Sequence, residues 1–321
     1  MQMPLIIFNK KALEMSFAWI FAIIAGAAIL FIAVYIAITL VDVGEYEINT
    51  KTTQAIINLL DPLQTSTEQG KTPEPLTLTK ETRIYTMCSS SGNFGENRIQ
   101  IQEKSGFRDN QWTEKSGDIG TISQYIFADE EIQGKKIYFF IMPYKMPFKV
   151  ADIMILHTKP YCFVNPVREI KDFIEPLSGN GINITNSVSQ CPGNSIKVCF
   201  ETKTGCDIGV YGAGEGIGIV QKDGKEIVYQ GNLVYAAIFS SKNNYECGVK
   251  RIMMRLEYLS ELYSKKAGFV SIKGCNTGLL SDINLLGTLA HNFKNPNDLN
   301  SIKTQADEID RKNENAICQL Y

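Results

Sequence analysis

The sequence predicts an α+β protein that is held to a membrane by one N-terminal transmembrane helix. Three features predict this class: an uncharged apolar run near the N-terminus, a long middle part rich in β-branched and aromatic residues, and a C-terminal part with apolar residues at helical spacing. The expected parts are a basic head (1–12), a transmembrane helix (13–41), a helical extension (42–60), a linker (61–81), a strand-rich part (82–240) and a C-terminal helical part (241–321).

The apolar run carries no charge from Ser16 to Val41. A helix needs about 20 such residues to cross a hydrocarbon layer of about 30 Å. A cleavable secretory signal has a shorter apolar region of about 7–15 residues that ends at a small-residue cleavage site. The length of this run therefore favours a retained anchor over a removed signal, and over a buried core helix.

The charges on either side of the run predict its orientation. Lys10 and Lys11 precede it, whereas Asp42, Glu45 and Glu47 follow it. Because basic residues stay on the cytoplasmic side, the N-terminus is expected in the cytoplasm and the rest of the chain outside. The predicted location is therefore the cell membrane, with a single pass and an extracellular C-terminal domain.

Small residues recur on one face of the predicted span. Ala18, Ala22 and Gly26 are spaced by four, the arrangement that lets two membrane helices approach closely. Alanine is also common in such helices without any pairing. Helix association through these three residues is therefore one of two interpretations.

The basic head followed by an uncleaved apolar helix resembles archaeal type IV pilin-like proteins with class III signal peptides. The residues that carry the resemblance are Lys10, Lys11 and Ala12. It covers about the first 50 residues, and it implies cleavage between Ala12 and Leu13 and packing of the processed helices into a filament. Glu14 departs from the family pattern. The remainder resembles only single-pass archaeal proteins, which implies no particular activity.

All eight cysteines follow the apolar run: Cys88, Cys162, Cys191, Cys199, Cys206, Cys247, Cys275 and Cys318. An even set confined to the translocated side is typical of a disulfide-bonded extracellular domain. Eight cysteines allow 105 pairings, so spacing alone does not assign them. The alternative is zinc, but no C-x₂-C spacing occurs. A bridge from Cys318 is expected to hold down the C-terminus.

The middle of the chain contains short runs typical of strands, and Asp223-Gly224 predicts a tight hairpin turn. A short helix is expected at "VREIKDFIEPL", which Pro176 ends. Further helices are expected from about 245 to Gly268, from Leu279 to Asn292, and from Asn297, which is interpreted as an N-cap. The apolar stripe of the first of these three leaves Arg251 on its polar side.

Few residues indicate chemistry. The glycines of "GVYGAGEGIGIV" alternate and fit neither nucleotide-binding pattern, so they are interpreted as close backbone contacts. His157 and His291 are interpreted as structural or surface residues. The acidic run 129–131 is interpreted as a solvated loop. Asn183 begins the sequon "NIT", which makes it a candidate for N-glycosylation.

The sequence therefore favours a non-enzymatic surface protein with a structural, adhesive or partner-binding role. Its expected partners are the membrane, other copies of itself or envelope proteins. No motif indicates a cofactor or a metal, and a formal net charge of −2 argues against nucleic acid. Two alternatives remain: a membrane-tethered extracytoplasmic hydrolase without a recognisable motif, and an accessory subunit of an envelope complex.

Overall fold

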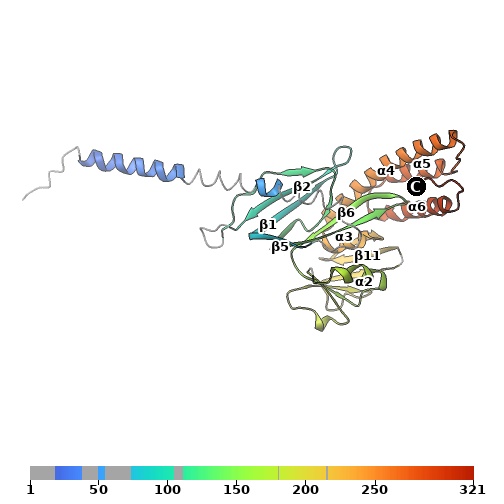
Figure 1. The fold of residues 1–321 in the computed structure, drawn as a ribbon. Helices are drawn as coiled ribbons and strands as arrows, with labels where there is room; N and C mark the ends of the chain where they lie inside the picture. The colour runs from blue at the N-terminus through green and yellow to red at the C-terminus, as the bar shows by residue number, and fades with distance from the viewer. Residues whose placement is uncertain (1–18, 38–49, 55–73, 105–110, 180, 215) are drawn as a thin grey trace, which may run out of the picture.

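The computed structural model describes residues 19–37, 50–54, 74–104, 111–179, 181–214 and 216–321. Behind an N-terminal helix, Trp19–Ala37, come two six-stranded sheets and then a group of C-terminal helices (Figure 1). This arrangement confirms the predicted α+β class, with the strands first and most of the helices last.

The first sheet contains the first six strands of the chain, in the spatial order β3-β2-β1-β5-β6-β4. All neighbours are antiparallel except β4 and β6, which are parallel. The strands are β1 (Leu76–Ser89), β2 (Glu96–Glu103), β3 (Ile119–Thr121), β4 (Tyr125–Phe127), β5 (Glu131–Lys145) and β6 (Lys149–His157).

The start of β1 corrects the predicted linker. The last residues of that predicted linker, from Leu76 to Glu81, belong to β1. Leu76 and Leu78 pack on an apolar cluster. Pro73 and Pro75 favoured a linker in the sequence, but the alternation that begins at Leu76 is that of a half-buried strand. Of the predicted helical extension (42–60), residues 50–54 are helical, and residues 42–49 and 55–60 lie outside the described residues, as do residues 61–73 of the predicted linker.

The second sheet has the order β12-β11-β10-β9-β7-β8. Its first four strands along the chain pair in parallel, and β10, β11 and β12 pair antiparallel. The strands are β7 (Tyr161–Val164), β8 (Ile182–Thr185), β9 (Ile196–Phe200), β10 (Ile208–Tyr211), β11 (Ile217–Lys222) and β12 (Lys225–Gln230). The hairpin at Asp223-Gly224 is confirmed, since both residues have the positive φ that its tight turn requires.

Helices lie between the strands of the second sheet and after them. They are α2 (Arg168–Ile174), the single 3₁₀ turns η1 (Glu175–Leu177), η2 (Val188–Gln190) and η3 (Pro296–Asp298), then α3 (Leu233–Phe239), α4 (Lys242–Ile272), α5 (Leu280–His291) and α6 (Leu299–Glu314). The predicted short helix before Pro176 and the predicted helix from Leu279 are confirmed as α2 and α5.

Three boundaries differ from expectation. Helix α3 lies in the part predicted to be strand-rich. The sequence does not mark it as a helix, because its seven consecutive buried residues show no helical periodicity. Helix α4 continues through Gly268, and Gly274 follows its end with a φ of 90°. Asn297, the predicted N-cap, lies inside η3, which Asn295 caps by accepting the Asn297 N–H and forming a capping box with Asp298; Asp298 is the residue that precedes α6.

The main core joins both sheets to the helices. Helix α4 packs on β1, β4 and β6, whereas α3 packs on β6, β11 and β12. Phe140 of β5, Phe163 of β7 and Phe239 of α3 are among the buried rings of this core. The opposite face of the first sheet carries a second apolar cluster that includes Ile101 and Leu156. Strands β4 and β6 are therefore buried on both faces, whereas β1 and β2 alternate between buried and more exposed residues.

Candidate functional site

The helix Trp19–Ala37 has the length and composition of a membrane span. Its 19 residues measure about 28 Å at 1.5 Å per residue. None of its apolar window is buried by the rest of the described chain, and Phe31 is 74% exposed. A large apolar surface without a protein partner is typical of a membrane or protein interaction site. This helix is therefore a candidate membrane span.

Part of the predicted association face lies on this helix. Ala22 and Gly26 are exposed, and a Cβ added at Gly26 would meet nothing within 4 Å. Ala18 lies outside the described residues, as do the processing candidates Lys11, Ala12 and Leu13. Helix association and processing both remain predictions.

The chain between the anchor and the domain makes a defined contact with the first sheet. Residues 50–54 form a helical turn beside β1 and β2 (Figure 1). Thr53 is fully buried and donates to Ser116 Oγ at 2.9 Å, and the Gly117 N–H donates to Thr50 Oγ1 at 2.9 Å. Ser116 Oγ also accepts from the Ile101 N–H, so this turn is bonded to the sheet.

The four disulfides account for all eight cysteines and confirm the predicted oxidised domain. Cys88 of β1 is bonded to Cys247 of α4, with the Cα atoms 6.0 Å apart. Cys275, just after α4, is bonded to Cys318, which confirms that a bridge holds the C-terminus. The zinc alternative is not supported, because every cysteine is paired and no metal-ligand cluster occurs in the described ranges.

The other two disulfides cover one face of the second sheet. Cys162–Cys191 and Cys199–Cys206 start from the neighbouring strands β7 and β9. The buried cysteines Cys162 and Cys199 form a small cluster with Val164 that is separate from the main core. The loops that carry Cys191 and Cys206 supply little apolar surface of their own. The covalent bonds therefore hold these loops where the packing area is small.

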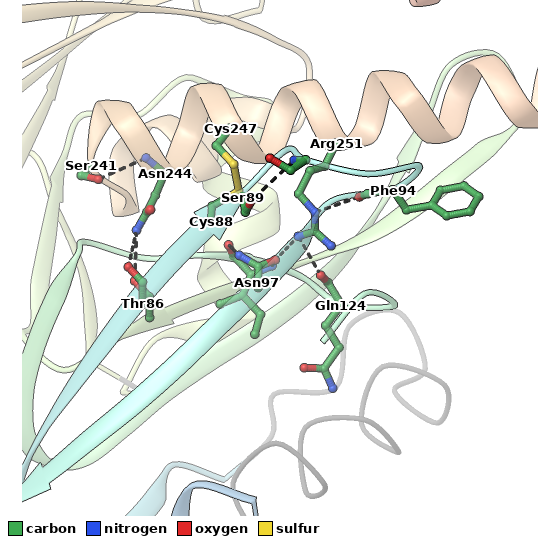
Figure 2. The surroundings of a disulfide bond; sticks show 12 residues. Thr86, Cys88, Ser89, Phe94, Asn97, Gln124, Ser241, Asn244, Cys247 and Arg251 are labelled. Atoms are coloured by element: carbon green, nitrogen blue, oxygen red, sulfur yellow. Dashed lines mark hydrogen bonds between the residues drawn. A yellow bond between two sulfur atoms is a disulfide. The ribbon is translucent and has the colours of Figure 1, made fainter. Parts of the chain in front are cut away.

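A polar face of α4 fastens the helix to the first sheet (Figure 2). Asn244 donates its amide to the Thr86 and Ala128 carbonyls at 3.1 Å. One turn further on, Cys247 forms its disulfide to β1, and Arg251 follows another turn later. These residues are spaced by three and four, so they lie on one side of the helix.

Arg251 corrects a prediction, since it is fully buried rather than on the polar side of α4. Its guanidinium donates to the carbonyls of Phe94, Gln124 and Ile122 at 3.0–3.1 Å and to Asn97 Oδ1. Burial lowers the pKa of Arg251 to about 10, so the group stays charged at neutral pH. Gly95, with a φ of 57°, gives the loop room, because a Cβ there would overlap the Ser89 carbonyl and approach the Arg251 side chain.

The acidic run at 129–131 lies at the surface and also forms bonds to neighbouring elements. Asp129 accepts from Lys222 Nζ at 2.8 Å, and this ammonium also donates to the Ile238 and Ser240 carbonyls. Glu130 accepts from Asn243 Nδ2 at 2.9 Å near the start of α4. The run therefore joins the first sheet to the second sheet and to α4, while Glu130 and Glu131 are exposed, as expected for a solvated loop.

The two histidines occupy different environments. His157 ends β6, is 3% exposed and stacks on Tyr138 with ring centroids 5.2 Å apart. Its Nδ1 lies 2.8 Å from the Lys159 carbonyl, so Nδ1 carries the proton. Its buried Nε2 has no partner among the described residues, and burial lowers the pKa to about 4. His291 on α5 is exposed and contacts Glu257.

These surroundings do not form a nucleophilic pair. Every cysteine is oxidised, and the His157 ring is enclosed by Tyr138, Tyr161 and Phe239. Gly212 and Gly218 have the predicted close backbone contacts, since a Cβ at Gly218 would overlap the Tyr211 carbonyl and the Tyr229 ring; Gly214 and Gly216 have a positive φ but no such contact. The geometry therefore supports the structural interpretation of these residues.

A polar cleft of about 1110 Å³ lies between α2 and the edge strand β8. Asn183 is half-buried on β8 and lines this cleft. N-glycosylation of Asn183 remains a prediction. Arg168, Asp172 and Glu175 lie on the α2 side. Amide, hydroxyl and charged groups dominate the lining, which is typical of a surface that exchanges hydrogen bonds with water or with a polar partner.

The distinguishing features of the chain are therefore an uncovered apolar helix and an oxidised domain fastened by four disulfides and a buried arginine. Comparison with protein-family models, with curated proteins and with solved structures finds no match.

Proposed function

We propose that this protein is a single-pass membrane protein that displays a disulfide-bonded α+β domain outside the cytoplasm as a structural or partner-binding module. The observation that carries the proposal is the helix Trp19–Ala37, whose apolar side chains no other part of the described chain covers. Lipid is the partner that this surface fits, because about 20 apolar helical residues match the hydrocarbon thickness.

The disulfides and the flanking charges support the sidedness. Disulfides persist in oxidising compartments and are rare in the cytosol, and all four lie after the helix. Lys10 and Lys11 precede the helix, whereas acids follow it. Both features agree with a cytoplasmic N-terminus and an external domain.

The binding role rests on what the domain offers to a partner. Its buried polar groups fasten α4 to the sheets, which makes a rigid body. The hydrogen-bonding cleft beside β8 and the outer face of the anchor are both open. We propose that copies associate in the membrane through the helix face that carries Ala22 and Gly26, and that the domain contacts external partners.

The first test concerns the membrane anchor alone and uses a substitution in the helix Trp19–Ala37. Ile29 is 68% exposed in the middle of the helix, and Ile29→Arg places a charge where lipid is expected. Insertion at the centre of a span then costs about 3 kcal/mol. We expect the Ile29→Arg chain to be released by alkaline carbonate, while the matched Ile29→Leu chain stays with the membrane.

Sidedness is read on the same membranes. We expect an externally added protease to remove the domain from sealed vesicles with the outer face exposed. Mass spectrometry is expected to show a gain of about two mass units per disulfide on reduction. A protected domain with free thiols would refute the proposed topology, and carbonate release of the Ile29→Leu chain would refute the anchor.

A further inference from the structure

The C-terminal half of α4 presents an apolar stripe to solvent. Tyr258, Leu262, Phe269 and Ile272 are 41%, 60%, 61% and 84% exposed. Lys265 completes the series, and its side chain is 71% exposed. We call these five residues the α4 stripe. From Tyr258 to Ile272 it extends for about 21 Å along the helix.

The spacing of the α4 stripe is that of a two-helix seam. Its residues follow one another at intervals of four, three, four and three, which is the a/d pattern of a heptad. In that pattern Leu262 and Phe269 are a positions. Tyr258, Lys265 and Ile272 are d positions, so Lys265 is the one charged residue of the series.

The same face of α4 is already an interface within the molecule. Arg251 and Asn244 lie seven and fourteen residues before Tyr258, at the same heptad position. Both fasten the first half of the helix to the first sheet. Tyr258 packs on Phe94 at 4.8 Å, and the next ring contact of α4 with that sheet comes from a different side of the helix, where Tyr263 stacks on Phe148 of the turn between β5 and β6. The α4 stripe therefore continues this docking face on the same side of the helix.

The charges beside the α4 stripe indicate which partner fits. Glu261 is a g position, and Lys266 and Lys273 are e positions. In a parallel helix pair, each g residue faces the e residue five positions later in the partner, so Glu261 of one copy faces Lys266 of the other. An antiparallel pair would instead bring the two basic e flanks together. Gly268, the next g position, adds no side chain at the seam.

We propose that the α4 stripe pairs with the same stripe of a second copy of this chain, in parallel, around a two-fold axis along α4. Two copies held in one membrane with the same orientation share such an axis along the membrane normal. Figure 1 shows α4 leading away from the turn at residues 50–54, through which the anchor joins the domain. Anchoring raises the effective concentration, which lets a two-heptad seam suffice.

Cysteine cross-linking of the full chain in membranes tests the pairing. Phe269→Cys places a thiol at an a position, where the two copies approach each other most closely. Leu285→Cys is the matched control, because Leu285 is 48% exposed on α5 and lies outside the α4 stripe. We expect Phe269→Cys to form covalent homodimer at least about fivefold more than Leu285→Cys under mild oxidation. Peptide mapping confirms that the four native disulfides are kept.

A charge exchange tests the register. With Phe269→Cys as the reporter, Glu261→Lys or Lys266→Glu alone places like charges across the seam, and each is expected to lower cross-linking about fivefold. The double exchange restores opposite charges and is expected to restore cross-linking. Circular dichroism verifies that each variant folds.

Three outcomes would overturn the pairing: equal cross-linking at positions 269 and 285, cross-linking of Phe269→Cys only to other proteins, or no response to the charge exchange. Pairing by the anchor alone gives the first of these outcomes, because both positions are then brought equally near. The result does not depend on which side of the membrane carries the domain. A failure of this inference is therefore distinguishable from a failure of the proposed topology.

Discussion

Acid is expected to destabilise the domain through His157. The neutral ring stacks on Tyr138, donates from Nδ1 to the Lys159 carbonyl and has a pKa of about 4 because of burial. In the unfolded chain the same ring has a pKa of about 6.5. Between these values the unfolded state binds the proton and the folded state does not. Stability is therefore full above about pH 6.5 and falls as the pH decreases toward 4.

The size of the effect follows from the two pKa values. A difference of about 2.5 pKa units corresponds to about 3.4 kcal/mol at pH values below both. At pH 4.5 most of this, about 2.5 kcal/mol, is already lost relative to pH 7.5. Because carboxylates also titrate in this range, only the difference between the parent chain and a variant reports on His157.

His157→Asn is the informative variant, because an amide nitrogen can replace Nδ1 as the donor to Lys159 without titrating. Between pH 7.5 and 4.5 we expect the parent to lose about 2.5 kcal/mol more unfolding free energy than the His157→Asn variant does. Urea unfolding followed by Trp112 fluorescence measures this. The control is His291→Asn, on an exposed residue of α5. If the parent and His157→Asn lose the same stability on acidification, the reasoning about the buried ring is wrong.

Three further predictions concern the buried arginine, the C-terminal bridge and the anchor. Arg251→Met leaves three carbonyls without a donor and is expected to cost about 3 kcal/mol of unfolding free energy, measured by urea titration; an unchanged midpoint would contradict the role of the bonds. Replacing Cys275 and Cys318 by Ser is expected to cost about 2–5 kcal/mol and to speed hydrogen exchange in α6; unaltered exchange would show that packing alone holds the tail. Gly26→Leu is expected to reduce cross-linking between anchors in membranes, with Ile29→Leu as the control, and equal cross-linking would remove the case for that face.

The parts of the fold that the sequence predicted are those in which local pattern and tertiary role agree. The hairpin at Asp223-Gly224 was predictable because only a few residue pairs accept two positive φ angles. Helix α5 was predictable because its apolar residues recur at helical spacing. Helix α3 was not, since seven consecutive apolar residues fit a buried strand and a buried helix equally well.

The polar interior was the least predictable part. Arg251 looked like a surface residue because burial of a guanidinium is rare, and it becomes favourable only when several carbonyls from separate loops converge on it. Those loops lie more than a hundred residues away in the chain, so no local pattern marks them. The disulfide pairing was hidden for the same reason. Of the α4 stripe, Leu262 was interpreted as part of the core-facing pattern, and Phe269 and Ile272 lie beyond the predicted end of the helix at Gly268.

The Cys88–Cys247 bond has a consequence for how the protein is made. Its two cysteines are 159 residues apart, and at about 5–20 residues per second the second one emerges about 8–30 s after the first. During that interval Cys162, Cys191, Cys199 and Cys206 emerge as well, and they close with each other over much shorter spans. Cys88 must stay reduced, or exchange partners, until α4 is delivered. Closure of the Cys88 bond therefore waits for the emergence of Cys247, although all strands of the first sheet have been synthesised by residue 157.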